Sequence, residues 1–188
     1  GLGSSSSSTV CAINALSNLN QNYLNKKQIS QIAIHIEQKI LKENVGSQDQ
    51  IAAAFGGFNK ISFKQDLDFT VENLLNREKI DILNQSTLLI FTGILRKSKM
   101  IERKKIENIK KNKLNKYLNE INKISVKALN EFRKKNFNLK IIGKLLNNQW
   151  EQKKLLSGEV SNSRIDKIIK ICLNNGAYGA KLLGSGGG

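Results

Sequence analysis

The sequence contains no proline, two cysteines, one tryptophan and a single histidine in 188 residues. With one histidine, a metal centre built from several histidines is excluded, and a Ser/His/Asp triad would depend on His35 alone. Helical spacing puts His35 away from the neighbouring isoleucine stripe, so we interpret it as structural rather than catalytic. Most hydrolase mechanisms are thereby excluded.

Cysteine and long apolar runs are both scarce. Cys11 and Cys172 lie far apart, in neither a metal-ligand nor a CxxC spacing, which is typical of buried free thiols in a reducing compartment. We therefore expect a cytoplasmic protein. No apolar run approaches the roughly 18 residues of a membrane-spanning helix, so we predict no membrane segment.

Acidic residues are few, with 15 Asp and Glu against 31 Lys and Arg, a net charge of +16. Such a charge raises nucleic acid as a partner class. However, 26 of the basic residues are lysines, only 6% of the residues are aromatic, and ten basic residues gather between Arg96 and Lys116. Stacking platforms do not alternate with these charges. We interpret the segment as a solvated helix face, with a phosphate-attracting surface as the alternative, and expect no nucleic-acid partner.

Glycine and serine are concentrated at the beginning, where residues 1–9 read GLGSSSSST. An amphipathic helix pattern follows, with Ala12, Leu16, Leu19 and Tyr23 predicted on one face. Glycines let a ligand approach the backbone, serines cap a helix N-terminus, and the helix dipole favours an anion there. The lysine of a Walker A loop is absent. Composition alone is also typical of a flexible linker.

Two further segments accompany this loop. Residues 46–50 read GSQDQ and are followed by Gly56 and Gly57, and residues 176–188 read GAYGAKLLGSGGG. The three segments, in this order, resemble the GHMP kinase superfamily. The motifs HIExxILKExxGxQDQxAAAxGGFNxIxF from His35, LLxFTGxxR from Leu88 and WExKKxLxxxxSNxRID from Trp150 resemble the branch that phosphorylates D-glycero-D-manno-heptose 7-phosphate. The resemblance covers nearly the whole chain. It implies a fragment without the family's N-terminal strands, first motif and final strand.

Local patterns predict the elements. Helices are expected over about 29–40, 99–135, 139–156 and 162–173, strands over 58–64 and 69–75, and a buried strand over 87–92. Ser47 is expected to cap a short helix with Gln50 as its capping-box partner. Strands early and helices late indicate an α+β fold in two lobes, 1–84 and 85–188. The resemblance implies the two-lobed GHMP kinase fold, truncated at both ends. Its N-terminal lobe is ribosomal S5 domain 2-like and its C-terminal lobe is ferredoxin-like and rich in helices.

The resemblance also implies ATP and Mg²⁺ as cofactors and assigns roles. It implies nucleotide binding by Gly1, Gly3, Ser4, Ser5, Ser6, Gly184, Gly186 and Gly187, and Mg²⁺ binding by Ser5 and Glu37. Thr92, Gly93 and Arg96 lie at the end of the predicted buried strand and are expected to bind the sugar phosphate, with a solvent-facing Arg96 as the alternative. Asp49 would be the catalytic residue that orients the sugar hydroxyl. Taken as residues alone, Glu37 fits the edge of an apolar helix face, and Asp49 fits an acid that complements a helix dipole. Trp150 is expected to be a packing residue.

The expected activity is ATP-dependent phosphorylation of the anomeric hydroxyl of a sugar phosphate, D-glycero-D-manno-heptose 7-phosphate, to the 1,7-bisphosphate. Two alternatives stay open. One is another GHMP sugar kinase, fucokinase-like or galactokinase-like. The other is an inactive basic binding protein on the same fold. No particular oligomeric state is predicted.

Overall fold

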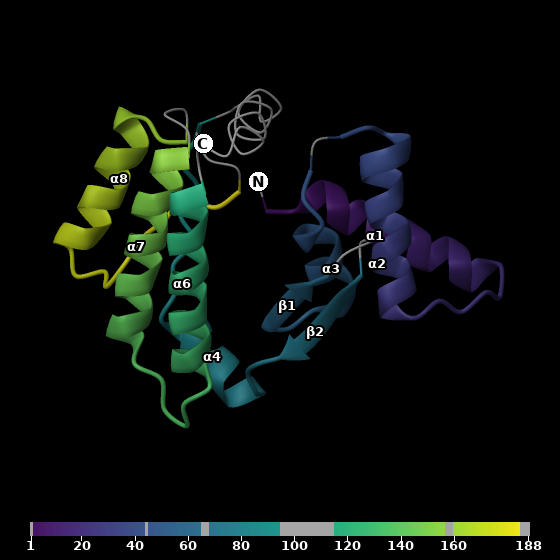
Figure 1. Cartoon of the computed structure of the whole chain (residues 1–188), viewed down its shortest axis with the longest axis horizontal. Coiled ribbons are helices and arrows are strands. Elements are labelled where there is room, and N and C mark those ends of the chain that lie inside the picture. Colours follow the sequence, from purple (N-terminus) through teal and green to yellow (C-terminus); the bar gives the residue numbers. More distant parts are fainter. Residues whose placement is uncertain (1, 44, 65–67, 95–114, 157–159, 185–188) are drawn as a thin grey trace. The chain divides into compact units, whose positions relative to one another are not determined.

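The computed structural model describes residues 2–43, 45–64, 68–94, 115–156 and 160–184. The chain divides into two compact units, Gly1–Leu75 and Asn76–Gly188. Each is drawn with its elements labelled in Figure 1. None of the helices in the described ranges combines the length and the apolar content needed to cross a membrane.

The first unit contains α1 (Ser4–Leu19), α2 (Lys26–His35), the π-helix η1 (Ile36–Ile40), α3 (Gln48–Phe55), β1 (Asn59–Phe63) and β2 (Phe69–Asn73). The two strands pair antiparallel, with Ile61 opposite Val71. Both strands lie where the β-branched and aromatic residues predicted them.

Two small apolar clusters hold this unit together. Val10 of α1 packs with Ile29 and Ala33 of α2. Ile51 of α3 packs with Phe69 of β2 in the second cluster, so α3 contacts both the helices and the hairpin. The position of α3 is therefore fixed from two sides, which matters for the residues in its first turn.

Helix α1 is predicted correctly, but the face that carries its regularly spaced apolar residues is not the buried one. Leu16, Leu19 and Tyr23 are 60%, 79% and 77% exposed, whereas Ser6 and Val10 are buried. The buried residues of α1 are Ser6, Val10 and Ser17, and Val10 packs against α2. A polar buried partner, Glu37, draws Ser6 inward. Hydrophobic spacing alone therefore points to the opposite side.

The capping predictions are partly wrong. Helix α3 does follow Ser47 and does end at Gly56, whose φ is 65°, but the Ser47 side chain makes no cap hydrogen bond. Its hydroxyl accepts from Gln38 Nε2 at 3.1 Å instead. The capping box lies at the start of α2, where the side chain of Asn25 and the side chain of Gln28 each accept from the other's backbone N–H.

The second unit contains α4 (Arg77–Gln85), α6 (Asn115–Phe132), α7 (Leu139–Leu156) and α8 (Ser163–Asn174). Helices α6 and α7 pack side by side (Figure 1). Trp150 of α7 is 1% exposed and packs with Val160 and Ile165, in agreement with its expected packing role. The part of the predicted 99–135 helix before Asn115 lies outside the described residues.

The compact units divide nine residues earlier than the predicted lobe boundary after Asn84. The reason lies in α4, because Lys79 donates from its ammonium group to the backbone carbonyls of Phe132 at 3.5 Å and Lys134 at 2.7 Å. A lysine at the C-terminal end of α6 also suits the helix dipole. Helix α4 is thereby tied to the second unit.

The buried strand predicted over 87–92 is not formed. Residues 87–94 have no regular secondary structure, and the side chains of Leu88, Leu89, Ile90 and Phe91 are 81%, 64%, 45% and 85% exposed. No strand of the described residues pairs with this run. A run of strand-forming residues becomes a strand only when a neighbouring backbone completes its hydrogen bonds.

Replacing Glu131 with glutamine is expected to destabilise the protein near neutral pH and to destabilise it less at about pH 3. The Glu131 carboxylate is buried at the end of α6 and accepts from Lys134 Nζ at 2.6 Å and the Asn138 amide at 2.9 Å. The Lys134 hydrogen bond, then the Asn138 bond, lowers the pKa of Glu131 below its ordinary value of 4.5. Its contribution is complete above the unfolded pKa and disappears as pH falls through the folded pKa. Urea denaturation of both proteins at the two pH values measures this.

Glu120→Gln is the matched control, because Glu120 pairs with Lys123 on the same helix with its side chain 43% exposed. An exposed pair contributes little. An equal destabilisation by the two substitutions would contradict the importance of the buried contact.

Candidate functional site

The site begins at the glycine-serine loop. Gly3 caps α1 with a left-handed backbone, φ 70° and ψ 23°, and no side chain caps this helix end. Glycine reaches this conformation without strain. The expected capping by serine hydroxyls is therefore not formed. Instead, the first-turn N–H groups, with the positive end of the helix dipole behind them, suit an anion such as a phosphate.

Glu37 lies next to the first turn of α1, in the π-helix η1. Its side chain is 1% exposed. π-Helical turns are rare in proteins, and those that occur are often found at functional sites. Two neutral groups donate to a single oxygen, Oε2, which accepts from Ser6 Oγ at 3.0 Å and from Gln50 Nε2 at 2.6 Å. The site therefore holds a buried carboxylate among uncharged donors.

Two acceptor oxygens in this cluster have no hydrogen-bond partner within the described ranges, Glu37 Oε1 and Gln50 Oε1. Buried polar atoms are seldom left unpaired, and each such group is a reason to look for a missing ligand. Hard divalent cations such as Mg²⁺ prefer oxygen ligands, carboxylates among them. The residues present therefore fit Mg²⁺, with Glu37 as its carboxylate ligand.

The described residues contain no group of three or more His, Cys, Asp or Glu side chains that could enclose a metal ion. Mg²⁺ commonly needs only one or two protein carboxylates, because water and substrate phosphates complete its coordination. One buried glutamate beside a phosphate loop matches that second arrangement. A Mg²⁺ ion held by Glu37 would need water and phosphate oxygens to complete its coordination.

The serine nearest to Glu37 differs from the predicted metal ligand. The hydroxyl in contact with Glu37 is that of Ser6, whereas the side chains of Ser4 and Ser5 are exposed. Ser5 therefore remains a prediction as a metal ligand. Gly1 lies outside the described residues.

Asp49 lies next to Gly3. It occupies the first turn of α3 and is exposed. A Cβ added to Gly3 would lie 3.5 Å from Asp49 Cβ and 3.6 Å from Asp49 Oδ2. A carboxylate this close to the loop would repel a triphosphate, and a divalent cation offsets that repulsion. The loop thus has one buried and one exposed carboxylate beside it.

The predicted sugar-phosphate residues belong to the second unit. Thr92 Oγ1 accepts from the Ile94 amide at 3.3 Å. Gly93 has φ 67°, and a Cβ there would lie 3.4 Å from Arg164 Nη2. Arg96 lies outside the described residues. Arg164 was not predicted to lie near these residues. It is the arginine of the SNxRID motif, so the motif was the feature of the sequence that could have pointed to it.

The C-terminal glycine segment is only partly described. Gly184 has φ 69° and its carbonyl accepts from Lys153 Nζ, while Gly186 and Gly187 lie outside the described residues. Lys181 donates to Gln149 Oε1. Burial lowers the pKa of Lys181, because a desolvated ammonium group is less stable than an exposed one.

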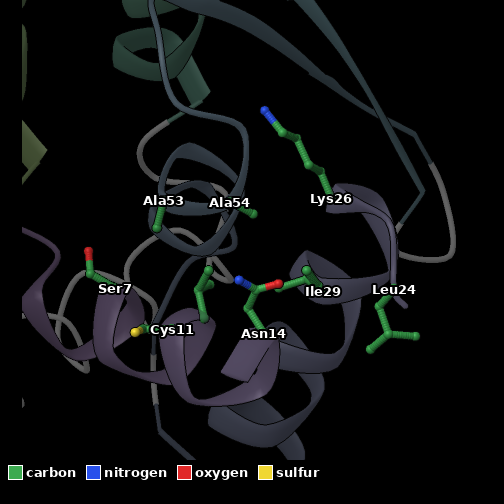
Figure 2. Close-up of a pocket in the computed structure, with 9 residues that line it drawn as sticks. Ser7, Cys11, Asn14, Leu24, Lys26, Ile29, Ala53 and Ala54 are labelled. Carbon is green, nitrogen blue, oxygen red and sulfur yellow. The ribbon is translucent and has the colours of Figure 1, made fainter. Parts of the chain in front are cut away.

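A separate cavity of about 400 Å³ opens between α1, α2 and α3. It is lined by the apolar Val10 and Ile29 and by the polar Ser7, Cys11 and Asn14. Figure 2 shows Ser7, Cys11 and Asn14 along one side of α1. Neither Glu37 nor Asp49 lines this cavity, so the cavity is not part of the candidate site.

Cys11 is expected to react with a maleimide faster than Cys172. Both thiols are free, but Cys11 is exposed whereas Cys172 is half-buried, which corrects the expectation that both are buried. Access controls thiol modification when no special activation is present. Peptide mass spectrometry after timed labelling measures the two rates, with Cys11→Ser as the control. Faster modification of Cys172 would contradict the exposure of Cys11.

Comparison with known proteins identifies the family to which the chain belongs. The family description "GHMP kinases N terminal domain" matches residues 1–57, and "GHMP kinases C terminal" matches residues 125–188. The chain belongs to the GHMP kinase family. This confirms the predicted two-lobed fold class.

Individual relatives agree with this assignment. The chain is 33% identical over 189 residues to the D-glycero-alpha-D-manno-heptose 7-phosphate kinase of Campylobacter jejuni, covering 100% of the chain and 55% of that protein. A crystal structure of a D-glycero-D-manno-heptose 1-phosphate kinase from Bacteriodes thetaiotaomicron has a TM-score of 0.63 at 26% identity, covering 99% of this chain and 51% of that one.

A more distant structure shows the same fold. The crystal structure of L. major mevalonate kinase in complex with R-mevalonate has a TM-score of 0.72 at 21% identity, covering 99% of this chain and 54% of that one. At this identity the likeness shows the fold alone. The chain spans about half the length of the relatives it matches.

Proposed function

We propose that the full-length protein transfers the γ-phosphoryl group of ATP to the anomeric hydroxyl of D-glycero-D-manno-heptose 7-phosphate, giving the 1,7-bisphosphate. The observation that carries this is the pairing of an uncapped helix N-terminus with the buried carboxylate of Glu37, whose second oxygen is unpartnered. The 33% identity to a heptose 7-phosphate kinase supports the choice of sugar.

Each residue has one task in this proposal. Backbone N–H groups and hydroxyls of Gly3 to Ser6 bind phosphate oxygens of ATP, with Gly1, Gly184, Gly186 and Gly187 as further nucleotide contacts. Glu37 holds Mg²⁺, with Ser5 as a second ligand. Bound Mg²⁺ would neutralise charge on the phosphates and on the phosphoryl group in transfer. Thr92, Gly93 and Arg96 bind the phosphate of the sugar.

Asp49 acts on the acceptor. The anomeric hydroxyl attacks the γ-phosphorus, its O–H bond breaks, and the bond between the γ-phosphorus and the β,γ-bridging oxygen breaks to release ADP. Asp49 accepts a hydrogen bond from that hydroxyl, orients it in line with the leaving group, and takes its proton as the O–H bond breaks. Its exposed position beside Gly3 supports this role, because substrate must reach it from solvent.

The test uses the full-length enzyme with ATP and Mg²⁺ and a panel of acceptors: heptose 7-phosphate, galactose and fucose. We expect kcat/KM to be highest for the heptose phosphate, with one ADP released per bisphosphate detected by ³¹P NMR. Preference for galactose or fucose would favour another GHMP sugar kinase. No turnover with any acceptor, together with tight and strongly salt-dependent RNA binding, would favour a basic binding protein.

A further inference from the structure

Gln50 is a buried polar residue to which the proposed reaction gives no task. Its side chain is 0% exposed, and it lies with Glu37 (1%) and Ser6 (5%) in one cluster. The three side chains come from three separate elements, α3, η1 and α1. Burying three polar groups costs stability unless their hydrogen bonds are made, yet this cluster leaves two oxygens unpaired. The arrangement therefore favours function over stability.

All donors in the cluster converge on the same atom. Gln50 Nε2 lies 2.6 Å and Ser6 Oγ lies 3.0 Å from Glu37 Oε2. A carboxylate only accepts hydrogen bonds, so the amide nitrogen of Gln50 has to face Glu37 and the amide oxygen has to point away. With Oε2 held twice, the carboxylate plane is fixed and Oε1 is left for another ligand.

The neighbour of Gln50 in sequence points the other way. Asp49 is exposed beside Gly3, whereas Gln50 is fully buried against Glu37. Both stand in the first turn of α3, whose Ile51 is packed in the core. One rigid helical turn thus sets the position of the exposed aspartate and of the buried glutamate together.

We propose that Gln50 is a positioning residue: by donating to Oε2 it orients Glu37 so that Oε1 faces the divalent cation. This inference rests on the proposed function, in which Glu37 holds Mg²⁺. Hydrogen-bond partners of a ligating group commonly change metal affinity by about 10- to 100-fold when removed. Gln50 acts through Glu37 and touches neither ATP nor sugar in this arrangement.

The experiment measures Mn²⁺ affinity in the full-length enzyme by electron paramagnetic resonance, in the presence of a non-hydrolysable ATP analogue. Mn²⁺ shares the oxygen-ligand preference of Mg²⁺. Gln50→Leu keeps most of the volume and removes the donor, and Gln50→Met, unbranched like glutamine, serves if the leucine variant does not fold. We expect the Mn²⁺ dissociation constant to rise about 10- to 100-fold. The Mg²⁺ concentration for half-maximal activity should rise in parallel, while kcat at saturating Mg²⁺ stays near wild type.

Gln48→Leu is the matched control, because Gln48 occupies the same turn of α3 and is exposed. It should leave the Mn²⁺ dissociation constant unchanged. A double-mutant cycle separates positioning from general damage. In a Glu37→Gln background, Gln50→Leu should weaken Mn²⁺ binding no further, because the group it orients is gone.

Two results would overturn the inference while leaving the proposed function intact. One is wild-type Mn²⁺ affinity in the Gln50 variant when Glu37→Gln alone weakens binding. The other is an additive effect of the two substitutions. A wild-type enzyme that neither binds Mn²⁺ nor needs a divalent cation would overturn the proposed function and this inference together.

Discussion

Asp49→Asn is expected to lower kcat of the full-length enzyme at least about a hundredfold, the lower range for a positioned proton-transfer group, with little change in ATP affinity. Asparagine keeps the size of aspartate and removes its charge and proton-accepting capacity. Asp49 is exposed in the first turn of α3 and lies against Gly3, so the substitution leaves the packing of α3 intact. The loss should therefore appear in the chemical step.

Glu37→Gln should give a different phenotype. Glu37 is buried and holds hydrogen bonds from Ser6 and Gln50 on one oxygen. The substituted glutamine lacks the negative charge that attracts Mg²⁺. The Mg²⁺ concentration that the enzyme requires should therefore rise, while kcat at saturating Mg²⁺ should fall less than it does in Asp49→Asn. The two substitutions thus separate the group at the hydroxyl from the group at the metal.

Steady-state kinetics at varied sugar, ATP and Mg²⁺ distinguishes the two cases. Circular dichroism confirms that both variants are folded. Near wild-type kcat in Asp49→Asn would return Asp49 to a role in helix-dipole stabilisation, and the catalytic assignment would be wrong.

The elements that the sequence predicted well are those decided by local chemistry. The hairpin at residues 59–73, the end of α3 at Gly56 and helices α7 and α8 each follow from turn residues, glycine or apolar spacing. The strand predicted over 87–92 was wrong, because a strand depends on a partner strand that lies elsewhere in the chain. Local pattern predicts the tendency, and tertiary contact decides the outcome.

The sequence pointed to residues that lie close together in the structure, but not to the contacts between them, and the roles of these residues stay predictions. Family motifs indicated Glu37 and Asp49. Glu37 lies next to the first turn of α1, and Asp49 lies in the first turn of α3 beside Gly3. The three-residue spacing from Ser47 to Gln50 predicts a capping box, in which Gln50 would be a capping residue. In the structure the side-chain amide of Gln50 donates instead to the buried carboxylate of Glu37. A charged acceptor forms a stronger hydrogen bond than a neutral one. The spacing of residues in the sequence cannot tell which of these two hydrogen bonds Gln50 will form.

Gly143→Ala is expected to destabilise the second unit by at least about 3 kcal/mol, the upper range for overpacking a core. Gly143 is buried inside α7, and Tyr178 and Gly179 of the C-terminal segment pass directly over it. A Cβ on Gly143 would lie 2.5 Å from the backbone carbon of Tyr178, and one on Gly179 would lie 2.5 Å from the backbone carbon of Gly143. Backbone atoms on both sides cannot move aside as a flexible side chain would.

The sign of this effect is the opposite of helix propensity, because alanine in an exposed helix interior is about 1 kcal/mol more favourable than glycine. Gly46→Ala is the control: a Cβ there meets nothing within 4 Å and the backbone φ is not positive, so it should be neutral or stabilise by up to about 1 kcal/mol. Urea denaturation of the full-length protein, followed by circular dichroism, measures both variants, and hydrogen exchange assigns the loss to α7 and the C-terminal segment. If Gly143→Ala were as stable as the Gly46 control, the direct backbone contact between α7 and residues 178–179 would not exist.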